Sequence, residues 1–457
     1  MHQKSKFPAP RILRTDSASR WRQENAILYA VVRGTPTARR EIGAADSLDW
    51  EYLLRAADYH GILPLLHQWI QSQREIAVPP EISLRLSGAY WANHFRNRML
   101  LEELVRVLQN AAAAGIAVMP LKGAALALLY YPTPALRPMS DLDLLLQPGD
   151  VVAMTALLHR LGYEEVSGAP VLLDERFYDA QQGEHRFVTH KDGCNVLIEF
   201  RIEPLDPLID TLSALDPVLD AALHDRAAWM WTRGQDAMHE RVPFARISPE
   251  DLLLHVASHL TTRHRYFRLL WLYDLSLVIT AHGNDIDWAY IGDAARRLRL
   301  SVPVYAALAA AQCLLGAPVP LAEMERMLFA GSERRRPLQR VGRAFFARRI
   351  RAANRGDLTA QSYAQVWLVA ASFGRLRGWK PRLRALRWIL FPSRAYLAAW
   401  GNEPIPVGHA AYAATFLHFI GISLLRALGG IGRFARVPVL PALIDRFMER
   451  RYPFTVP

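Results

Sequence analysis

Residues 118–147, VMPLKGAALALLYYPTPALRPMSDLDLLLQ, constrain the fold of this chain more than any other stretch. They predict an apolar strand at 117–121, a turn at Lys122-Gly123, a helix to about residue 131, a proline-rich turn and a second strand from Asp141. Side chains alternate along a strand, so Asp141 and Asp143 share one face while the leucines between and after them face a core. Two carboxylates on one face repel each other unless a cation lies between them, and a divalent metal ion is the obvious candidate.

Length and charge limit the classes of protein to which this chain can belong. Its 457 residues are too many for one ordinary hydrophobic core, so two or three domains are expected. The net charge is +12, and residues 330–457 carry the whole excess, with 22 Lys and Arg against 5 Asp and Glu. A basic region of this kind is typical of contact with nucleic acid or an anionic membrane surface, and an arginine-rich solvated surface is the simpler alternative.

The sequence favours a cytoplasmic protein, peripheral at a membrane if its basic region binds lipid. Only two cysteines are present, Cys194 and Cys313, which fits a reducing compartment. Residues 1–20 lack the apolar segment of a secretory signal. The longest apolar run, 410–425, is shorter than the roughly 20 residues that span a bilayer, so no transmembrane helix is expected.

The predicted fold is α+β and predominantly helical, with one small sheet. Helices are expected over residues 19–32, 47–60, 64–72, 81–114, 151–161 and, without intervening strands, from 217 to the end. A hairpin of strands 185–190 and 194–201 is predicted from the Asp-Gly turn between them. The expected division is a flexible segment at 1–45, a helical segment at 46–115, a catalytic core at 116–215, a helical domain completing the cleft at 216–329 and a basic helical region at 330–457.

The acidic pair is suited to phosphoryl or nucleotidyl transfer. That chemistry uses two metal ions about 3.5–4 Å apart, typically held by three carboxylates. Asp141, Asp143 and Glu199, which is the one acid in an apolar strand, are the candidates for both catalysis and metal binding. Mg²⁺, or Mn²⁺, prefers such oxygen ligands together with substrate phosphates. The alternative for Glu199 is an ordinary salt bridge to Arg186, Lys191 or Arg201.

A phosphate site is expected next to these acids. The helix that starts after Lys122-Gly123 presents backbone N–H groups and its positive end to a triphosphate. Lys122 adds a point charge, and Arg137 can bind phosphate in a bidentate manner. Ala124 and Ser140 complete the predicted nucleotide-binding set.

The Lys-Gly turn, the helix, Arg137 and the run Asp141-Leu142-Asp143 resemble the signature of the polymerase-β-like nucleotidyltransferase superfamily. More narrowly, the chain resembles a bacterial family of uncharacterised nucleotidyltransferases over about residues 47–320. The likeness extends to Asp49-Trp50, His60-Gly61, Val78-Pro79, residues 248–252, Trp271 and Asp287-Trp288. It departs from the superfamily at Ala124, where serine or glycine is usual.

This resemblance implies a polymerase-β-like sheet embedded between helices. It also implies Mg²⁺-dependent transfer of a nucleoside monophosphate from an NTP to an acceptor hydroxyl, with release of pyrophosphate. The acceptor is a small molecule, a sugar, a peptide or RNA. Two alternatives remain open: a non-catalytic nucleotide-binding or scaffold protein that acts through its basic C-terminal surface, and a toxin-like transferase that modifies tRNA or protein.

Several polar residues outside the motif are candidates for the cleft. His255 and His259 have the i, i+4 spacing of zinc ligands, but they lack a Glu between them and a third ligand. We expect them to lie in the core or the cleft, with Asp274 as a hydrogen-bond partner. His185, at the start of the hairpin, can reach a phosphate or lie on a solvated strand edge.

Overall fold

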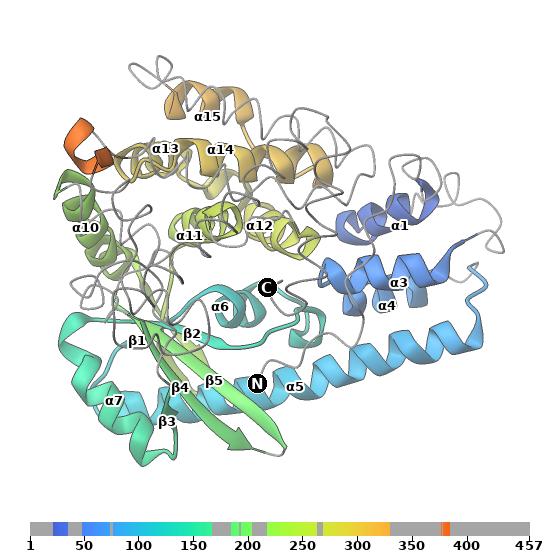
Figure 1. Ribbon diagram of the computed structural model, residues 1–457, viewed down its shortest axis with the longest axis horizontal. Helices are drawn as coiled ribbons and strands as arrows, with labels where there is room; N and C mark the ends of the chain where they lie inside the picture. The colour runs from blue at the N-terminus through green and yellow to red at the C-terminus, as the bar shows by residue number, and fades with distance from the viewer. Residues whose placement is uncertain are drawn as a thin grey trace, which may run out of the picture.

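The computed structural model describes residues 22–34, 48–73, 76–166, 184–191, 193–202, 217–262, 268–329, 376 and 378–383. It confirms a predominantly helical α+β fold with one small mixed sheet, arranged in layers (Figure 1). The long helix α5 (Pro80–Ala113) runs along one side of the sheet, and α6 (Lys122–Leu129), α11 (Pro249–Thr262) and α12 (Leu269–His282) lie on the other. The helices α13 (Trp288–Arg297), α14 (Ser301–Ala310) and α15 (Leu321–Leu328) form an outer layer beyond them.

The five strands of the sheet follow the order β1 (Val118–Pro120), β2 (Leu142–Leu146), β5 (Cys194–Arg201), β4 (Glu184–Lys191) and β3 (Glu164–Glu165). Of the four neighbouring pairs, only β2 and β5 are parallel, and the other three pairs are antiparallel. The predicted first strand, Asp-Leu-Asp strand and hairpin are therefore confirmed. A parallel pair needs a long connection between its two strands. Here that connection runs through α7 (Val151–Arg160), β3 and β4.

The two faces of the sheet belong to two hydrophobic cores. Leu142, Leu144, Ile198 and Phe200 face a core that α5 and α7 close from outside. The opposite face carries Leu145 and joins a larger core formed mainly by helices. The strict alternation along β2 thus assigns Asp143 to the side of the larger core.

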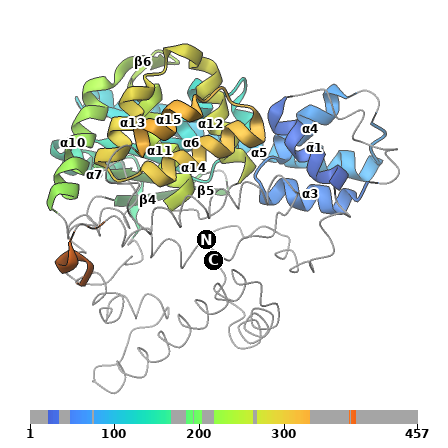
Figure 2. The same cartoon turned by 90° about the horizontal axis from the view of Figure 1, so that it is seen from above.

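The larger core unites helices from both ends of the described chain. It contains residues of α1 (Arg22–Arg33), α3 (Trp50–Tyr59) and α4 (Leu63–Ser72) together with residues of α11 to α15 and the π-helix Ala311–Leu315. In Figure 2, α1, α3 and α4 cluster at one end of the molecule. The helix expected at 19–32 is α1, and its Arg33 side chain donates to the Leu314 carbonyl at 2.6 Å. The helical segments placed before and after the catalytic core therefore share one core.

Helix ends follow the sequence signals. The α5 helix begins with Pro80 at its first position, and Gly115 follows it with a φ of 72°, as expected for a C-terminal glycine. The Asp49 and Asp287 side chains each accept a backbone N–H at 2.9 Å and start α3 and α13. Ser248 and Asp251 form a reciprocal cap at the start of α11, which confirms that predicted helix.

One prediction is wrong: residues after 217 are not helical throughout. Following α10 (Pro217–Arg233), β6 (Gln235–His239) and β7 (Val242–Arg246) form a separate antiparallel hairpin, and β7 packs against β1 and α5. The two turn residues, Glu240 and Arg241, have φ values of 48° and 68°. Such a turn usually carries Asn-Gly, so its sequence gave no hairpin signal.

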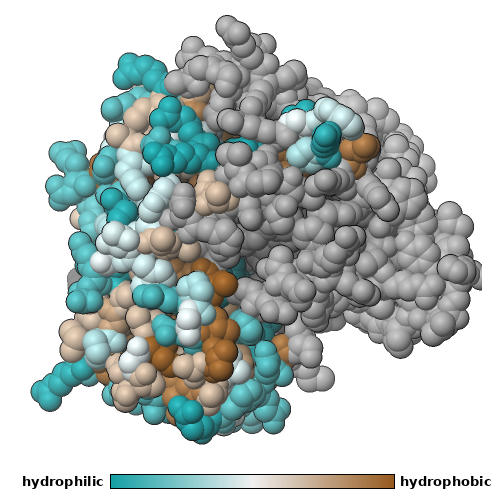
Figure 3. All heavy atoms as spheres, turned by 90° about the vertical axis from the view of Figure 1, so that its left-hand side faces the viewer, coloured by the Kyte–Doolittle hydropathy of each residue, from teal (hydrophilic) through white to brown (hydrophobic). Residues whose placement is uncertain are grey.

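The surface of the described chain carries few large apolar groups. On the side formed by α7 and α10, hydrophilic side chains predominate and hydrophobic ones gather low, around α7 (Figure 3). Within the described ranges, no helix has both the length and the apolar character needed to cross a bilayer. The basic region 330–457, with its apolar run 410–425, lies outside the described residues except for 376 and 378–383.

Candidate active site

The parallel pairing of β2 and β5 brings two of the predicted acids side by side. Asp143 lies directly opposite Glu199 in the register. Partners in a parallel pair project from the same face, on strands about 4.8 Å apart. Both side chains are almost completely buried, at 4% and 6% exposure. Two neighbouring buried carboxylates require cationic partners, and the structure supplies one to each.

Lys122 neutralises Asp143. Its ammonium Nζ donates to Asp143 Oδ1 at 2.6 Å, and both side chains are largely shielded from solvent. The backbone of Lys122 has a φ of 44°, in the left-handed region that residues with a Cβ rarely adopt. Strained backbone of this kind is found mostly at functional turns, where the surrounding structure holds it in place. Here the turn directs the Lys122 side chain across to β2.

Arg186 neutralises Glu199. The two residues are opposite each other in the β4–β5 register, and Arg186 NH2 is 2.7 Å from Glu199 Oε1. Of the three salt-bridge partners considered from the sequence, the structure therefore shows Arg186. The ion pair does not remove Glu199 from the acidic cluster, because Asp143 remains its neighbour on β2.

Asp141 lies just before β2 and is half-buried. The Ser140 hydroxyl donates to its Oδ1 at 3.0 Å. Burial, and next the charge of Asp143, raise the pKa of Asp141 above its ordinary value, against a smaller opposing effect of Lys122. The two aspartates of the motif therefore repel each other when both are ionised, which is the condition that a bound cation relieves.

The donor set suits a hard divalent cation, but the acids do not form a finished metal site. Carboxylate oxygens are the ligands that Mg²⁺ and Mn²⁺ prefer. Among the residues that the structure describes, no three His, Cys, Asp or Glu side chains are grouped closely enough to hold a metal ion. Lys122 and Arg186 instead occupy oxygens of Asp143 and Glu199. Each cation contacts one oxygen of its carboxylate, so a metal ion bound by Asp143 and Glu199 would compete with Lys122 and Arg186 for their charge.

The start of α6 is packed more tightly than its sequence suggests. A Cβ added to Gly123 would lie 2.7 Å from Arg137 NH1 and 3.3 Å from Met139 Cγ, so a larger residue here would displace the Arg137 guanidinium. Ala124 is fully buried in the core of the sheet. A serine at this point would bury its hydroxyl in that apolar core, which accounts for alanine here.

Arg137 is held by an acid. Its Nε and NH2 donate to the two carboxylate oxygens of Asp274 at 3.1 and 3.0 Å, and the Tyr131 hydroxyl donates to the same carboxylate at 2.7 Å. All three side chains are buried. Asp274 is thus a partner of Arg137 and not the expected partner of the two histidines. These contacts favour a positioning role for Arg137 against Gly123, and direct contact with phosphate stays a prediction.

Polar residues on α5, which no sequence motif indicated, hold the loop that leads to the aspartates. Asn97, fully buried, donates to the carbonyls of Pro134 and Arg137, both at 2.6 Å. Asn93 donates to the Ala135 carbonyl, and Arg96 to those of Met139 and Ser140. The signal in the sequence was two asparagines with i, i+4 spacing on a long helix, where a core-facing helix would normally place apolar residues.

The candidate histidines do not join the acids. His185 pairs with Phe200 across the strands and stacks on its ring at 4.7 Å, on the face opposite to Glu199. Its neighbour Arg186 faces the site instead. His255 and His259 stack on each other at 6.2 Å on α11, whose neighbouring residues belong to the larger core. No zinc site forms around them within the described part of the chain.

The comparisons with known proteins agree with the motif. A family model described as an uncharacterised nucleotidyltransferase matches residues 46–316, more than half of the chain. No curated protein and no solved structure matches it. The matched range includes the strand, turn and helix around Lys122, the acids of β2 and β5, and the helices up to the π-helix. The chain therefore belongs to the family of uncharacterised nucleotidyltransferases, whose general activity is nucleotidyl transfer.

Proposed function

We propose that this chain transfers a nucleoside monophosphate from an NTP to an acceptor hydroxyl and releases pyrophosphate. The observation that carries the proposal is the register of β2 and β5, with Asp143 opposite Glu199 and next to Lys122. In nucleotidyl transfer the protein mainly positions the reactants and stabilises developing charge. The neighbouring acids on β2 and β5, with Lys122 at the start of α6, provide the groups for both tasks.

In this proposal Asp141 and Asp143 hold a divalent cation, Mg²⁺ or Mn²⁺, and Glu199 is the third ligand. The cation would supply charge that neutralises the phosphates and aligns the attacking and leaving oxygens. Lys122 and Arg186, which now pair with Asp143 and Glu199, are suitable partners for phosphate oxygens. On arrival of the nucleotide, each can exchange a carboxylate for a phosphate.

The remaining residues would position the triphosphate and the acceptor. Backbone N–H groups at the start of α6, together with the positive end of that helix, would lie against phosphate oxygens. Arg137, paired with Asp274, would add a fixed positive charge behind the turn. Glu199 could also accept the proton of the acceptor hydroxyl once Arg186 has turned to the phosphates.

The test is to incubate the full chain with α-labelled NTPs, Mg²⁺ and a cell extract, and to measure pyrophosphate and labelled products. The Asp141→Asn/Asp143→Asn variant should lose both signals. The matched control is Asp293→Asn, which removes an exposed acid on α13. Equal pyrophosphate release by the wild type and the double variant would refute the proposal. The labelled species would also distinguish a small-molecule acceptor from tRNA or protein.

A second function, nucleotide binding without transfer, is favoured by one observation. Asp143 and Glu199 are already neutralised by Lys122 and Arg186, so two of the three acids are charge-balanced without a metal ion. A protein of this kind would bind an NTP through Lys122 whether or not Mg²⁺ is present. Saturable NTP binding that does not respond to chelation of divalent ions, with no pyrophosphate release, would establish this alternative.

A further inference from the structure

A polar pocket of about 370 Å³ lies outside the proposed nucleotide site. It is formed where the ends of α10, β7, α11 and α12 meet, and its wall includes Arg233, Arg246, Ser248, Glu250, His282 and Asp285. None of the residues proposed to bind the nucleotide lines it. Its volume is within the range of roughly 300–1,000 Å³ that small-molecule sites occupy.

One side of the pocket is a fixed ionic network. Arg233 NH2 is 2.7 Å from Glu250 Oε2, and the other carboxylate oxygen of Glu250 accepts the Asp287 N–H at 3.1 Å. The Arg233 guanidinium also lies 3.9 Å from the centre of the Tyr290 ring. Arg233 also forms an ion pair with Asp251, whose Oδ2 is 3.4 Å from its Nε, so the charge of Arg233 is already balanced by two acids, although its Nε makes no hydrogen bond.

Arg246 is the cation of the pocket that lacks an acidic partner. Within the described residues it forms no ion pair, and its Nε is buried without a hydrogen-bond partner. Its guanidinium lies within hydrogen-bonding reach of the neutral Tyr130 hydroxyl, which is 3.1 Å from His282 Nε2. Burial, and next the charge of Arg246, lower the pKa of His282, so this histidine is uncharged at neutral pH and leaves the positive charge here to Arg246. The buried Nε–H of Arg246 is thus the donor left without a partner, and such a donor costs free energy unless a ligand satisfies it.

Asp285 provides the opposing charge, but at an exposed position. It lies in the short helix after α12 and has no ion pair among the described residues. A charge in contact with solvent is screened more strongly than a half-buried guanidinium. Inside the pocket the field of Arg246 therefore outweighs that of Asp285, which weakens but does not reverse the attraction for an anion.

We propose that this pocket binds a carboxylate or phosphate group of a small molecule, with Arg246 as its principal contact. The pocket is connected to the nucleotide site through α6. Tyr130 follows the last residue of that helix and contacts His282, while Lys122 at its start contacts Asp143. The eight residues of α6 span about 12 Å. The anion site is thus a separate site at the far end of the same short helix, and it does not depend on nucleotidyl transfer.

Calorimetric titration of the full chain with inorganic phosphate and with succinate tests the proposal and separates the two anion classes. At least one anion should bind saturably. Arg246→Gln should weaken that binding about tenfold or more, because a charge-assisted hydrogen bond is lost, and Arg246→Lys should retain part of it. Asp285→Asn should strengthen binding a few-fold. Opposite effects at these two positions are expected of a charge-selective pocket and not of general damage to the fold.

Arg296→Gln is the matched control, since it removes an exposed arginine that pairs with Asp293 on α13. It should leave anion affinity unchanged. The proposal is overturned if neither anion binds saturably, or if Arg246→Gln and Arg296→Gln bind alike, which would indicate adventitious surface binding. It is also overturned if phosphate binding is lost in Lys122→Met and kept in Arg246→Gln, because the anion would then occupy the nucleotide site.

Discussion

At the scale of single residues, the decisive feature is that two of the three acids of the candidate site, Asp143 and Glu199, already have cationic partners. Lys122 reaches Asp143 from a strained turn, and Arg186 reaches Glu199 from the next strand. Each cation can pair either with its carboxylate or with a phosphate. Binding of metal and binding of nucleotide are therefore expected to be coupled, since the nucleotide draws away the charges that compete with the metal.

Lys122→Met should make Mn²⁺ bind more tightly to the nucleotide-free protein, because the ammonium group no longer occupies Asp143. A severalfold gain is expected, measured by the loss of the free Mn²⁺ electron paramagnetic resonance signal on titration. Lys191→Met is the matched control, because it removes a lysine from another buried acid, Glu103. If Lys122→Met binds Mn²⁺ no better than wild type, Lys122 does not compete with the metal ion for Asp143.

How much of the site could be predicted depended on whether the signal was local. The alternation of Leu142, Asp143 and Leu144 is local to one strand, and it sufficed to place Asp143 on the face opposite to the two leucines. The partner of Arg137 could not be inferred, because Asp274 lies 137 positions away on α12 and only tertiary packing brings the two together. The β6–β7 hairpin was missed because Glu240 and Arg241 adopt left-handed conformations that are normally signalled by glycine or asparagine.

At the scale of elements, α5 supports both the sheet and the motif loop, which is the loop at 130–141 that leads to the aspartates. Its Asn97 holds the carbonyls of Pro134 and Arg137, just before the aspartates. Asn97→Leu should leave these buried acceptors without a donor and lower the free energy of unfolding by about 1–3 kcal/mol. Urea unfolding measures this loss. Asn110→Leu removes only a bond to the Arg106 carbonyl of the same helix, so it should lower the free energy of unfolding clearly less. Equal losses in the two variants would show that Asn97 does not hold the loop before the aspartates.

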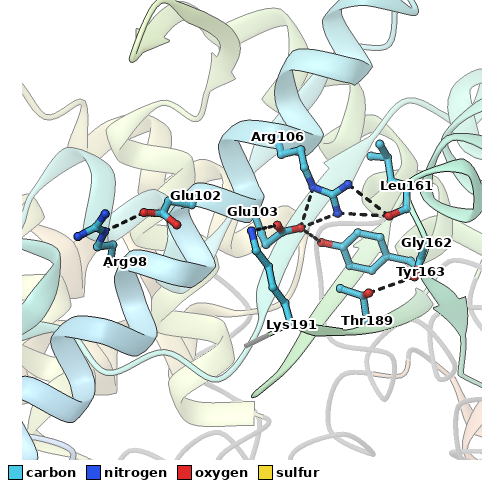
Figure 4. A network of polar contacts seen from close by, with 9 residues as sticks. All are labelled: Arg98, Glu102, Glu103, Arg106, Leu161, Gly162, Tyr163, Thr189 and Lys191. Atoms are coloured by element: carbon cyan, nitrogen blue, oxygen red, sulfur yellow. Dashed lines mark hydrogen bonds and ion pairs between the residues drawn. The ribbon is translucent and has the colours of Figure 1, made fainter. Parts of the chain in front are cut away.

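The same helix also holds the hairpin and the end of α7 through a buried acid. Glu103, 1% exposed, accepts from Lys191 at 2.6 Å, Arg106 at 2.7 Å and Tyr163 at 2.8 Å (Figure 4). Burial alone would raise the pKa of Glu103, but these three donors together lower it below its ordinary value of 4.5. A carboxyl with a depressed folded-state pKa stabilises the protein above its unfolded pKa, and that stabilisation is lost as the pH falls through the folded value.

Glu103→Gln should therefore destabilise the protein at pH 7, by about 1–3 kcal/mol, and the difference from wild type should shrink as the pH falls below 4.5. Urea unfolding at a series of pH values gives both quantities. Glu102→Gln is the control on the same helix, because Glu102 is half-exposed and pairs with exposed Arg98 (Figure 4). A destabilisation that stays constant from pH 7 to pH 3.5 would show that the Glu103 charge is not the cause.

At the scale of the whole molecule, the Arg137–Asp274 pair joins the motif loop to the helical layer through the larger core. Removing one partner of a buried ion pair leaves an uncompensated charge, which typically costs about 3–5 kcal/mol. Asp274→Ala should therefore be strongly destabilised in urea unfolding. The double variant Arg137→Met/Asp274→Leu removes both charges and should recover most of that loss, since apolar replacement of a buried pair is often neutral.

The double variant also decides what Arg137 does. If its role is to position the turn at Gly123, a variant that restores packing should bind Mg²⁺-ATP within about threefold of wild type. If Arg137 contacts a phosphate directly, the same folded variant should lose at least about tenfold in affinity, because a charge-assisted bond is missing. Titration calorimetry on protein shown to be folded by its urea transition separates the two. The buried bidentate geometry favours the first outcome, and the second would return Arg137 to the nucleotide-binding set.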